Sequence, residues 1–264
     1  MALRNEQQRA LITGATSGIG RATAARFARE GMAVGILAEA ADAVEQTVRD
    51  IRGNGGNAFG VHADLSRPEG VMGLIDRVEE EYGSIDILVN NAGIGMQADI
   101  LETRDEDLRR LFEVNFLSMF TLSRDALRRM SERGSGRIIN ISSASGRRAL
   151  PGMSVYACTK AAMHALSQAM RVEARASGVR VVEILPMTVR TPFFEQAVNR
   201  SRKSYAYGGW SITPEALAEK ILAAVHHPRP EVYTSSLARL AFIVDAVHPG
   251  WLDAILIRRR AKGL

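Results

Sequence analysis

The stretch Arg9-Ala-Leu-Ile-Thr13-Gly14-Ala-Thr-Ser-Gly18-Ile-Gly20 runs from a short apolar segment through a glycine-rich turn into a helix that we expect over residues 18–29. Glycines in such a turn let the backbone approach a pyrophosphate, and the helix N-terminus offers free N–H groups and the positive end of the helix dipole. Glycine-rich turns occur in many proteins, so the context decides. Here the turn follows the first strand of an alternating pattern, which favours a phosphate-binding loop.

Strands and helices alternate along most of the chain. Runs rich in Val and Ile without strict alternation are typical of strands covered on both faces. A chain that alternates in this way forms a parallel sheet wrapped by helices, so we expect a doubly wound, three-layer α/β/α fold in one domain over residues 1–264. The predicted strands are 9–13, 32–38, 58–62, 85–90, 137–141 and 179–185, and the predicted helices are 18–29, 42–52, 68–82, 105–133 and 155–177.

The charge of the chain lies mostly in its tail. The formal net charge is +5, and the four basic residues among 258–262 leave only +1 for the rest. Because nucleic-acid binding requires a basic face on the domain, we expect no nucleic-acid partner. Cys158 is the single cysteine, and residues 1–9 lack the apolar core of a signal peptide. Both observations indicate a reducing, cytoplasmic location.

Tyr156 and Lys160 are four residues apart in the predicted helix 155–177 and therefore share one face of it. A lysine ammonium beside a tyrosine hydroxyl stabilises the phenolate and lowers the pKa of the tyrosine from about 10. Such a phenol can exchange a proton with a substrate oxygen. The pair alone is weak evidence, because tyrosine and lysine are common on helix surfaces.

Five motifs in register make the pair specific. With them the chain resembles the short-chain dehydrogenases/reductases over roughly residues 8–195. The resemblance implies a Rossmann-type domain that moves a hydride between a nicotinamide and a carbonyl or secondary alcohol carbon. The motifs are the G-x-x-x-G-x-G loop at 13–20, Asn90-Asn91-Ala92-Gly93, Asn115, Ser142-Ser143 and Tyr156-x-x-x-Lys160.

The resemblance assigns the catalytic roles. Tyr156 would be the general acid/base, and Lys160 would lower its pKa and hold the nicotinamide ribose. The family serine lies thirteen residues before the tyrosine, which selects Ser143 over Ser142 to hold the substrate oxygen. Asn115 would serve the proton relay from a bent helix, although a solvated mid-helix asparagine is the alternative. Cys158, a small and nearly apolar residue, is expected in the core.

The same resemblance implies a set of cofactor-binding residues. Asp64-Leu65 would hold the adenine, but an aspartate that starts a turn is an equally simple interpretation. The chain departs from the family at Pro186-Met187, where a glycine usually follows the proline. The full set is Gly14, Thr16, Ser17, Gly18, Ile19, Gly20, Glu39, Asp64, Leu65, Asn91, Ala92, Gly93, Tyr156, Lys160, Pro186, Val189 and Thr191.

The choice of coenzyme is made at the end of the second strand. An acidic group there accepts the adenosine 2′-hydroxyl of NAD, whereas an arginine binds the 2′-phosphate of NADP. Ala38 stands where an NAD-type aspartate is usual, and Glu39 stands where NADP enzymes often carry arginine. Because a carboxylate repels a phosphate, NAD is favoured. Arg21, just inside the first helix, keeps NADP open.

The chain from residue 193 onward is expected to determine the substrate. Residues 193–230 read as a lid followed by a helix over 213–226, with aromatic residues at 205–210 that either close the site or pack. A last strand is expected at 231–234. His226 and His227 lack ligand partners nearby, so no metal site is expected.

Residues 235–264 form a predicted helical extension with apolar stretches at 237–247 and 251–257. It could cover the substrate pocket, form a dimer surface or lie on a membrane surface with the arginines 258–260 at the headgroups. Similar tails in the family accompany lipid-like substrates, which favours an apolar alcohol or ketone. A homodimer or homotetramer is expected. The alternative function is an inactive dinucleotide-binding regulator or scaffold.

Overall fold

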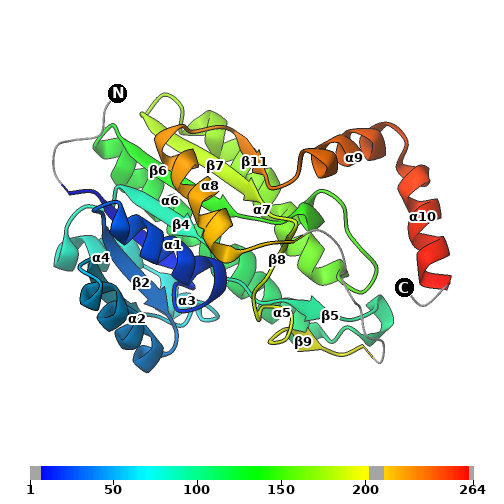
Figure 1. Ribbon diagram of the computed structural model, residues 1–264, viewed down its shortest axis with the longest axis horizontal. Helices are drawn as coiled ribbons and strands as arrows, with labels where there is room; N and C mark the ends of the chain where they lie inside the picture. Colours follow the sequence, from blue (N-terminus) through cyan, green and yellow to red (C-terminus); the bar gives the residue numbers. More distant parts are fainter. Residues whose placement is uncertain (1–6, 202–210, 262–264) are drawn as a thin grey trace.

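A parallel sheet of seven strands forms the middle of the computed structural model, which describes residues 7–201 and 211–261 (Figure 1). The strand order is β11-β7-β6-β4-β1-β2-β3, so the order reverses between β1 and β4 and opens a crevice at their carboxyl ends. The Rossmann-type fold expected from the sequence is confirmed. The strands are β1 (Arg9–Thr13), β2 (Ala33–Ala38), β3 (Asn57–His62), β4 (Ile87–Asn90), β6 (Gly136–Ile141), β7 (Val179–Leu185) and β11 (Glu231–Tyr233).

Helices cover both faces of this sheet (Figure 1). In β1, Ala10 and Ile12 pack into the core beneath one group of helices, whereas Leu11 packs into the core beneath the other. Successive strand residues point to opposite faces, so a strand covered on both sides has no polar face. The first group is α1 (Gly18–Arg29), α2 (Ala41–Gly53) and α8 (Pro214–His226), and the second is α4 (Leu74–Tyr82), α6 (Ser118–Glu132) and α7 (Ser154–Glu173).

Two predicted helices are interrupted. The helix expected over 68–82 is divided into α3 (Pro68–Val71) and α4, because Gly73 adopts the left-handed region with φ of 63°. The helix expected over 105–133 consists of α5 (Asp105–Phe112), a π-helical turn over Glu113–Leu117 and α6. The remaining short strands are β5 (Met96–Gln97), β8 (Thr188–Val189), β9 (Val198–Asn199) and β10 (Ser211–Ile212).

The C-terminal helices α9 (Ser236–Val247) and α10 (Pro249–Ala261) project from the sheet (Figure 1). Arg148 fastens them to the loop before α7 through ion pairs with Asp245, at 3.4 Å, and Asp253. Within the described residues no single helix is long and apolar enough to cross a membrane. The segments Ser236–Val247 and Gly250–Arg258 pass that test only as a pair bent by 113°.

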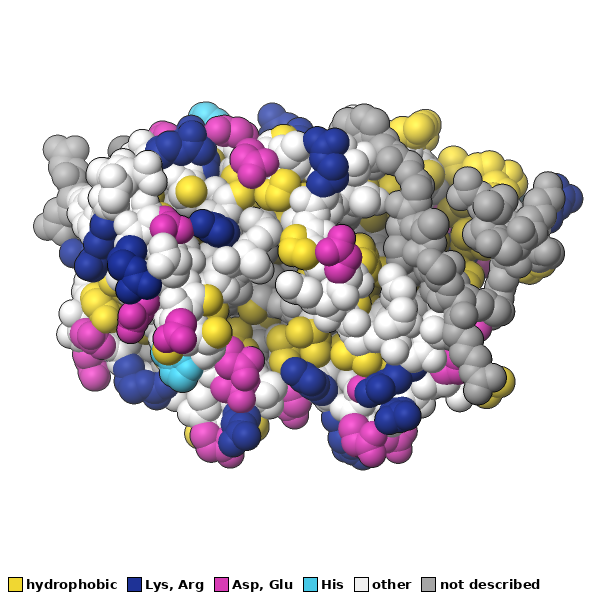
Figure 2. Space-filling model, turned by 60° about the horizontal axis from the view of Figure 1, so that its bottom comes forward, with side chains coloured by type: hydrophobic (Ala, Val, Ile, Leu, Met, Phe, Trp, Pro, Cys, Tyr) yellow, Lys and Arg dark blue, Asp and Glu magenta, His cyan; other side chains and the backbone are white. Residues whose placement is uncertain are grey.

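Figure 2 shows basic and acidic side chains interspersed over one face, with hydrophobic side chains gathered near its middle and at the C-terminal end. Large hydrophobic side chains are exposed along the described part of α9 and α10. They are Leu237, Leu240, Ile243, Val244, Val247, Trp251 and Ile257. Residues 202–210, which include the aromatic end of the expected lid, lie outside the described part of the chain.

Candidate active site

The glycine loop between β1 and α1 leaves no room for side chains. Gly14 and Gly18 have positive φ values of 62° and 49°. A Cβ on Gly20 would lie 2.2 Å from the carbonyl oxygen of Gly14, and a Cβ on Gly14 would lie 2.9 Å from Cα of Ala92. The loop is therefore a compact cradle at the N-terminus of α1, where backbone amides can meet a phosphate.

Thr13 joins this cradle to the loop after β4. Its Oγ1 accepts hydrogen bonds from the amides of Asn91 and Ala92, each at 2.9 Å, and donates one to the carbonyl of Val89 at 3.4 Å. In return, Nδ2 of Asn91 donates to the carbonyls of Thr13, at 2.9 Å, and Gly14, at 3.2 Å. The two loops thus form one hydrogen-bonded unit, which was not predicted from the sequence.

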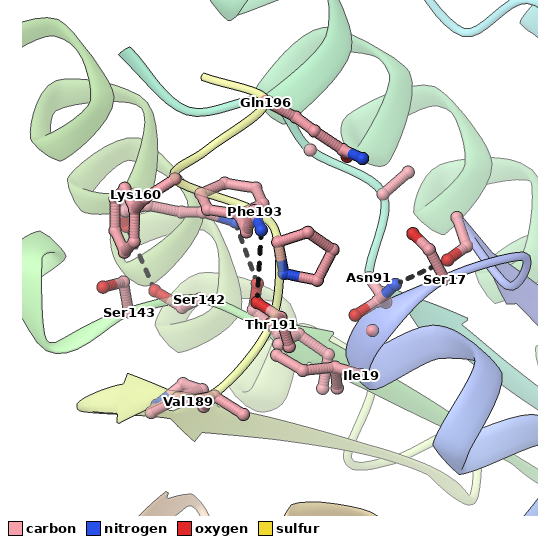
Figure 3. A pocket seen from close by; sticks show the side chains of 18 of the residues that line it. Ser17, Ile19, Asn91, Ser142, Ser143, Lys160, Val189, Thr191, Phe193 and Gln196 are labelled. Atoms are coloured by element: carbon pink, nitrogen blue, oxygen red, sulfur yellow. Dashed lines mark hydrogen bonds between the residues drawn. The ribbon is translucent and has the colours of Figure 1, made fainter. Parts of the chain in front are cut away.

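A cleft extends from this unit to the start of α7 (Figure 3). Ser17, Ile19 and Asn91 lie at one end of it, and Ser142, Ser143 and Lys160 lie at the other. The predicted cofactor residues in its lining are Gly14, Ser17, Gly18, Ile19, Asn91, Ala92, Gly93, Tyr156, Lys160, Pro186, Val189 and Thr191.

Five predicted cofactor residues lie outside the lining of this cleft: Thr16, Gly20, Glu39, Asp64 and Leu65. The carboxylate of Asp64 accepts hydrogen bonds from the amide and hydroxyl of Ser66, at 2.8 and 2.6 Å, which lower its pKa. Leu65 is buried in the core. Asp64 therefore has the turn geometry that is the alternative interpretation of its sequence.

Ser143, Tyr156 and Lys160 meet at the inner end of the cleft. The Tyr156 side chain is almost fully buried and is hydrogen-bonded to that of Ser143. The hydroxyl of Ser142 instead donates a hydrogen bond to the backbone carbonyl of Lys160 at 3.3 Å. Ser143, which the family spacing selects, thus lies with Tyr156, whereas the hydroxyl of Ser142 is used in a bond to the backbone.

The pKa of Tyr156 differs from the sequence expectation. Burial raises it to about 12, against a smaller lowering by the Ser143 hydrogen bond, whereas the sequence predicts that Lys160 lowers it. Lys160 is itself buried, and this lowers its pKa to about 8. Its Nζ donates to the carbonyl of Ile141 at 3.0 Å. Two groups removed from water both favour their neutral forms, which explains the difference.

Asn115 is fully buried in the π-helical turn, so the solvated alternative is wrong. Its Oδ1 accepts from the amide of Ile94 at 2.8 Å, and its Nδ2 donates to the carbonyl of Ile94 at 3.0 Å and to Oγ1 of Thr159 at 3.1 Å. Thr159 in turn donates to the carbonyl of Tyr156 at 2.7 Å. Asn115 therefore connects the loop after β4 to the helix of the tyrosine.

The outer wall of the cleft is apolar. The rings of Phe193 and Phe194 lie 5.8 and 6.4 Å from that of Tyr156, centroid to centroid. Met187, which replaces the family glycine, also lines the cleft, and its amide donates to Oγ1 of Thr234 at 2.9 Å. The sequence predicts that the lid begins at residue 193. Gln196, within this predicted lid, also lines the cleft, although the sequence did not single it out.

Cys158 is exposed, so its expected place in the core is wrong. A helix turns by about 100° per residue, which puts Cys158 roughly 200° away from Tyr156, on the solvent side. Glu183 and His164 were not predicted as site residues. Nδ1 of His164, one helical turn after Lys160, lies 2.6 Å from Oε2 of Glu183. A glutamate within the Val- and Ile-rich strand Val179–Leu185 was the available signal, because a buried carboxylate requires a partner.

The family model described as short chain dehydrogenase matches residues 8–202. This chain belongs to the short-chain dehydrogenase family. It is accordingly an oxidoreductase that acts on CH–OH groups and binds a nucleotide in its Rossmann fold.

Known relatives agree with this membership. The "uncharacterized oxidoreductase YvrD" of Bacillus subtilis is 39% identical over 186 residues, which cover 70% of each chain. A short-chain dehydrogenase of Sphingobium yanoikuyae, solved in complex with NADPH, superposes with a TM-score of 0.80 at 28% identity, covering 93% of this chain and 95% of that one. A "bulky-bulky ketone specific alcohol dehydrogenase" from Comamonas testosteroni has a TM-score of 0.78 at 26% identity, covering 93% and 94%.

Proposed function

We propose that the protein interconverts an apolar ketone and the corresponding secondary alcohol, with Tyr156 as the general acid/base. The observation that carries this proposal is the hydrogen-bonded pair of Tyr156 and Ser143 at the inner end of a cleft whose outer wall holds Phe193 and Phe194. A carbonyl oxygen held by the Ser143 hydroxyl would lie next to the proton that the Tyr156 hydroxyl donates.

The protonation of the two groups suits this role. With its pKa at about 12, Tyr156 is a neutral phenol near pH 7 and can donate its proton during ketone reduction. The phenolate that results is stabilised by the nearby ammonium of Lys160. In the oxidation direction the same phenolate accepts the proton of the alcohol. Asn115 would hold the loop after β4 and the helix of Tyr156 in the geometry that this exchange requires.

The residues at the other end of the cleft fit a nicotinamide dinucleotide, which supplies or accepts the hydride when bound. The close approach of Gly14 and Gly20 lets a pyrophosphate reach the backbone at the N-terminus of α1. Asn91, Ala92 and Gly93 would form one wall for the coenzyme. Thr191, between the two ends of the cleft in Figure 3, would bind the carboxamide.

We favour NAD over NADP as the coenzyme. Residues 38–41 are Ala-Glu-Ala-Ala and contain no base for a 2′-phosphate. The alternative partner, Arg21, is held by Asp50 in an ion pair of 2.7 Å. The NADPH in the Sphingobium relative leaves this choice open for the present chain. A kcat/KM for NADPH that exceeds the value for NADH would refute the preference.

The substrate side is apolar because Met187, Val189, Phe193 and Phe194 contribute to the lining. A bulky or lipid-like ketone buries more of that surface than a small polar one, which favours its binding. The name of the Comamonas relative agrees with such a substrate. We further propose a cytoplasmic homodimer or homotetramer, with the apolar face of α9 and α10 at the subunit interface or on a membrane surface.

The substitution Tyr156→Phe tests the acid/base role. It removes one hydroxyl and keeps the ring that packs against Phe193, so we expect kcat to fall at least about 100-fold while NADH binding, measured by fluorescence, stays within a few-fold. Tyr82→Phe is the matched control, because Tyr82 lies against Phe59 away from the cleft. A Tyr156→Phe enzyme with more than about a tenth of the wild-type kcat contradicts the role. Binding of NADH without turnover of any ketone by the wild type would favour a regulator.

A further inference from the structure

A row of polar side chains crosses the sheet beneath α7. Asn90, Asn140, Glu183 and Glu231 are register partners on β4, β6, β7 and β11. Nδ2 of Asn90 donates to Oδ1 of Asn140 at 2.9 Å, and Nδ2 of Asn140 donates to Oγ of Ser167 on α7 at 2.9 Å. The last two side chains of the row, Glu183 and Glu231, are carboxylates. Glu183 is fully buried, whereas Glu231 is partly exposed.

Glu183 is incompletely satisfied. One carboxylate oxygen, Oε2, lies 2.6 Å from Nδ1 of His164, which is on α7 one turn beyond Lys160. The other oxygen, Oε1, has no hydrogen-bond partner among the described residues. Removal of a carboxylate from water costs several kcal/mol, and positive charge nearby offsets this cost.

The charged and titratable groups around Glu183 come from three parts of the chain. Helix α7 contributes His164 and Lys160, and the loop after β6 contributes Arg147, whose Nη1 lies 2.5 Å from Nε2 of His164. Strand β11 contributes Glu231 and Tyr233, and the hydroxyl of Tyr233 donates to Oε2 of Glu231 at 2.7 Å. Glu231 thus has its own donor, and the positive groups nearest to Glu183 all lie on the side of α7.

The charged form of Lys160 has few other sources of stabilisation. Its side chain is almost fully buried. Among the described residues, the hydrogen-bond partners of its Nζ are both neutral, the carbonyl of Ile141 at 3.0 Å and the sulfur of Met163 at 3.3 Å. Ile141 is the register partner of Ile184, next to Glu183. Burial lowers the pKa of Lys160 to about 8, and the charge of Glu183 is the influence that raises it. Near pH 8 the charged and neutral forms of Lys160 are therefore similarly populated.

We propose that Glu183 is a positioning residue for the reaction. Its buried carboxylate, held by His164, keeps the ammonium of Lys160 charged beside the ring of Tyr156. The effect on turnover rests on the proposed function, but the effect on the charge of Lys160 does not.

The charge of Lys160 can be measured without turnover. The chain has four lysines, Lys160, Lys203, Lys220 and Lys262, so full-length protein labelled with ¹³C-lysine gives four Cε signals. Lys160→Arg assigns the signal, and its shift against pH gives the midpoint. We expect a midpoint near 8 in the wild type and one about a unit lower in Glu183→Gln.

Two further variants serve as controls for this measurement. Glu183→Met replaces the carboxylate with an apolar side chain of similar volume, a change that buried sites often tolerate, and it should lower the midpoint equally. Glu231→Gln is the matched control on the neighbouring strand and should leave the midpoint of Lys160 unchanged. An unaltered midpoint in both Glu183 variants, or an equal shift in Glu231→Gln, would overturn the proposal.

The pH dependence of kcat/KM gives a second test. A midpoint lowered by one unit from 8 reduces the charged fraction of Lys160 at pH 8 about fivefold and hardly changes it at pH 6. Glu183→Gln should therefore lose activity only on the alkaline side, and Glu183→Asp should restore part of it. A loss of equal size at every pH would indicate structural damage and contradict the proposal. If the wild type turns over no ketone, the proposed function fails while the midpoint still decides the role of Glu183.

Discussion

Gly20→Ala is a sharp test of the glycine cradle. The added Cβ would lie 2.2 Å from the carbonyl oxygen of Gly14 and 2.6 Å from Nδ2 of Asn91. Such contacts essentially never fall below 3.0 Å, so the backbone of Gly14 or the start of α1 must move by roughly 0.8 Å. The displacement also strains the bonds between Asn91 and the carbonyls of Thr13 and Gly14.

Overpacking of this kind destabilises a protein by about 1–3 kcal/mol. For a chain of this size the melting temperature should fall by about 2–6 °C, and NADH affinity should fall at least about tenfold because the amides of the cradle lose their alignment. Gly53→Ala is the control. Gly53 ends α2, has no positive φ, and nothing lies within 4 Å of the added Cβ.

Differential scanning fluorimetry and a fluorescence titration with NADH measure the two effects. Gly53→Ala should leave affinity unchanged and stability equal or slightly higher, because alanine is the better helix residue. The reasoning is refuted if Gly20→Ala binds NADH as tightly as Gly53→Ala does, because the contact with Gly14 would then be relieved without any effect on the cradle.

Two further predictions concern ion pairs outside the cleft. Asp107 accepts two hydrogen bonds from Arg200, at 2.8 and 3.0 Å, and these lower its pKa. Its carboxylate therefore stabilises the fold above pH ~4 and loses this effect as the pH falls through the lowered pKa. In urea unfolding, Asp107→Asn should lower the free energy of unfolding by about 1 kcal/mol at pH 7 and by less at pH 3. Equal losses at the two pH values would contradict this. Arg148→Ala removes the ion pairs to Asp245 and Asp253, so trypsin should cleave at Arg239 several-fold faster than in the wild type. An unchanged cleavage rate would show that other contacts hold α9 and α10.

The sheet was predictable because its signals are local. Strand β1 and the glycine turn after it begin and end where the sequence indicates, since a short apolar run before a glycine turn has few alternatives in an alternating chain. The break at Gly73 was not predictable with the same certainty, because a single glycine is tolerated within a helix. Only the left-handed φ that Gly73 adopts decides the matter.

The candidate site divides in the same way. Helix geometry predicts that Tyr156 and Lys160 share one face, and the family resemblance predicts that Ser143 joins them. The π-helical turn at Asn115 depends on bonds to Ile94, about twenty residues away, and local propensity cannot reveal it. The direction of the pKa of Tyr156 depends on burial, which the sequence does not contain.

The hydroxyl of Thr13 has a consequence for the energetics of coenzyme capture. Because it holds the amides of Asn91 and Ala92, two loops from distant parts of the chain are immobilised when the protein folds. The conformational entropy of these loops is then already lost before a ligand arrives. A dinucleotide therefore meets a rigid receptor, and Thr13→Val should slow its capture less than it speeds its release.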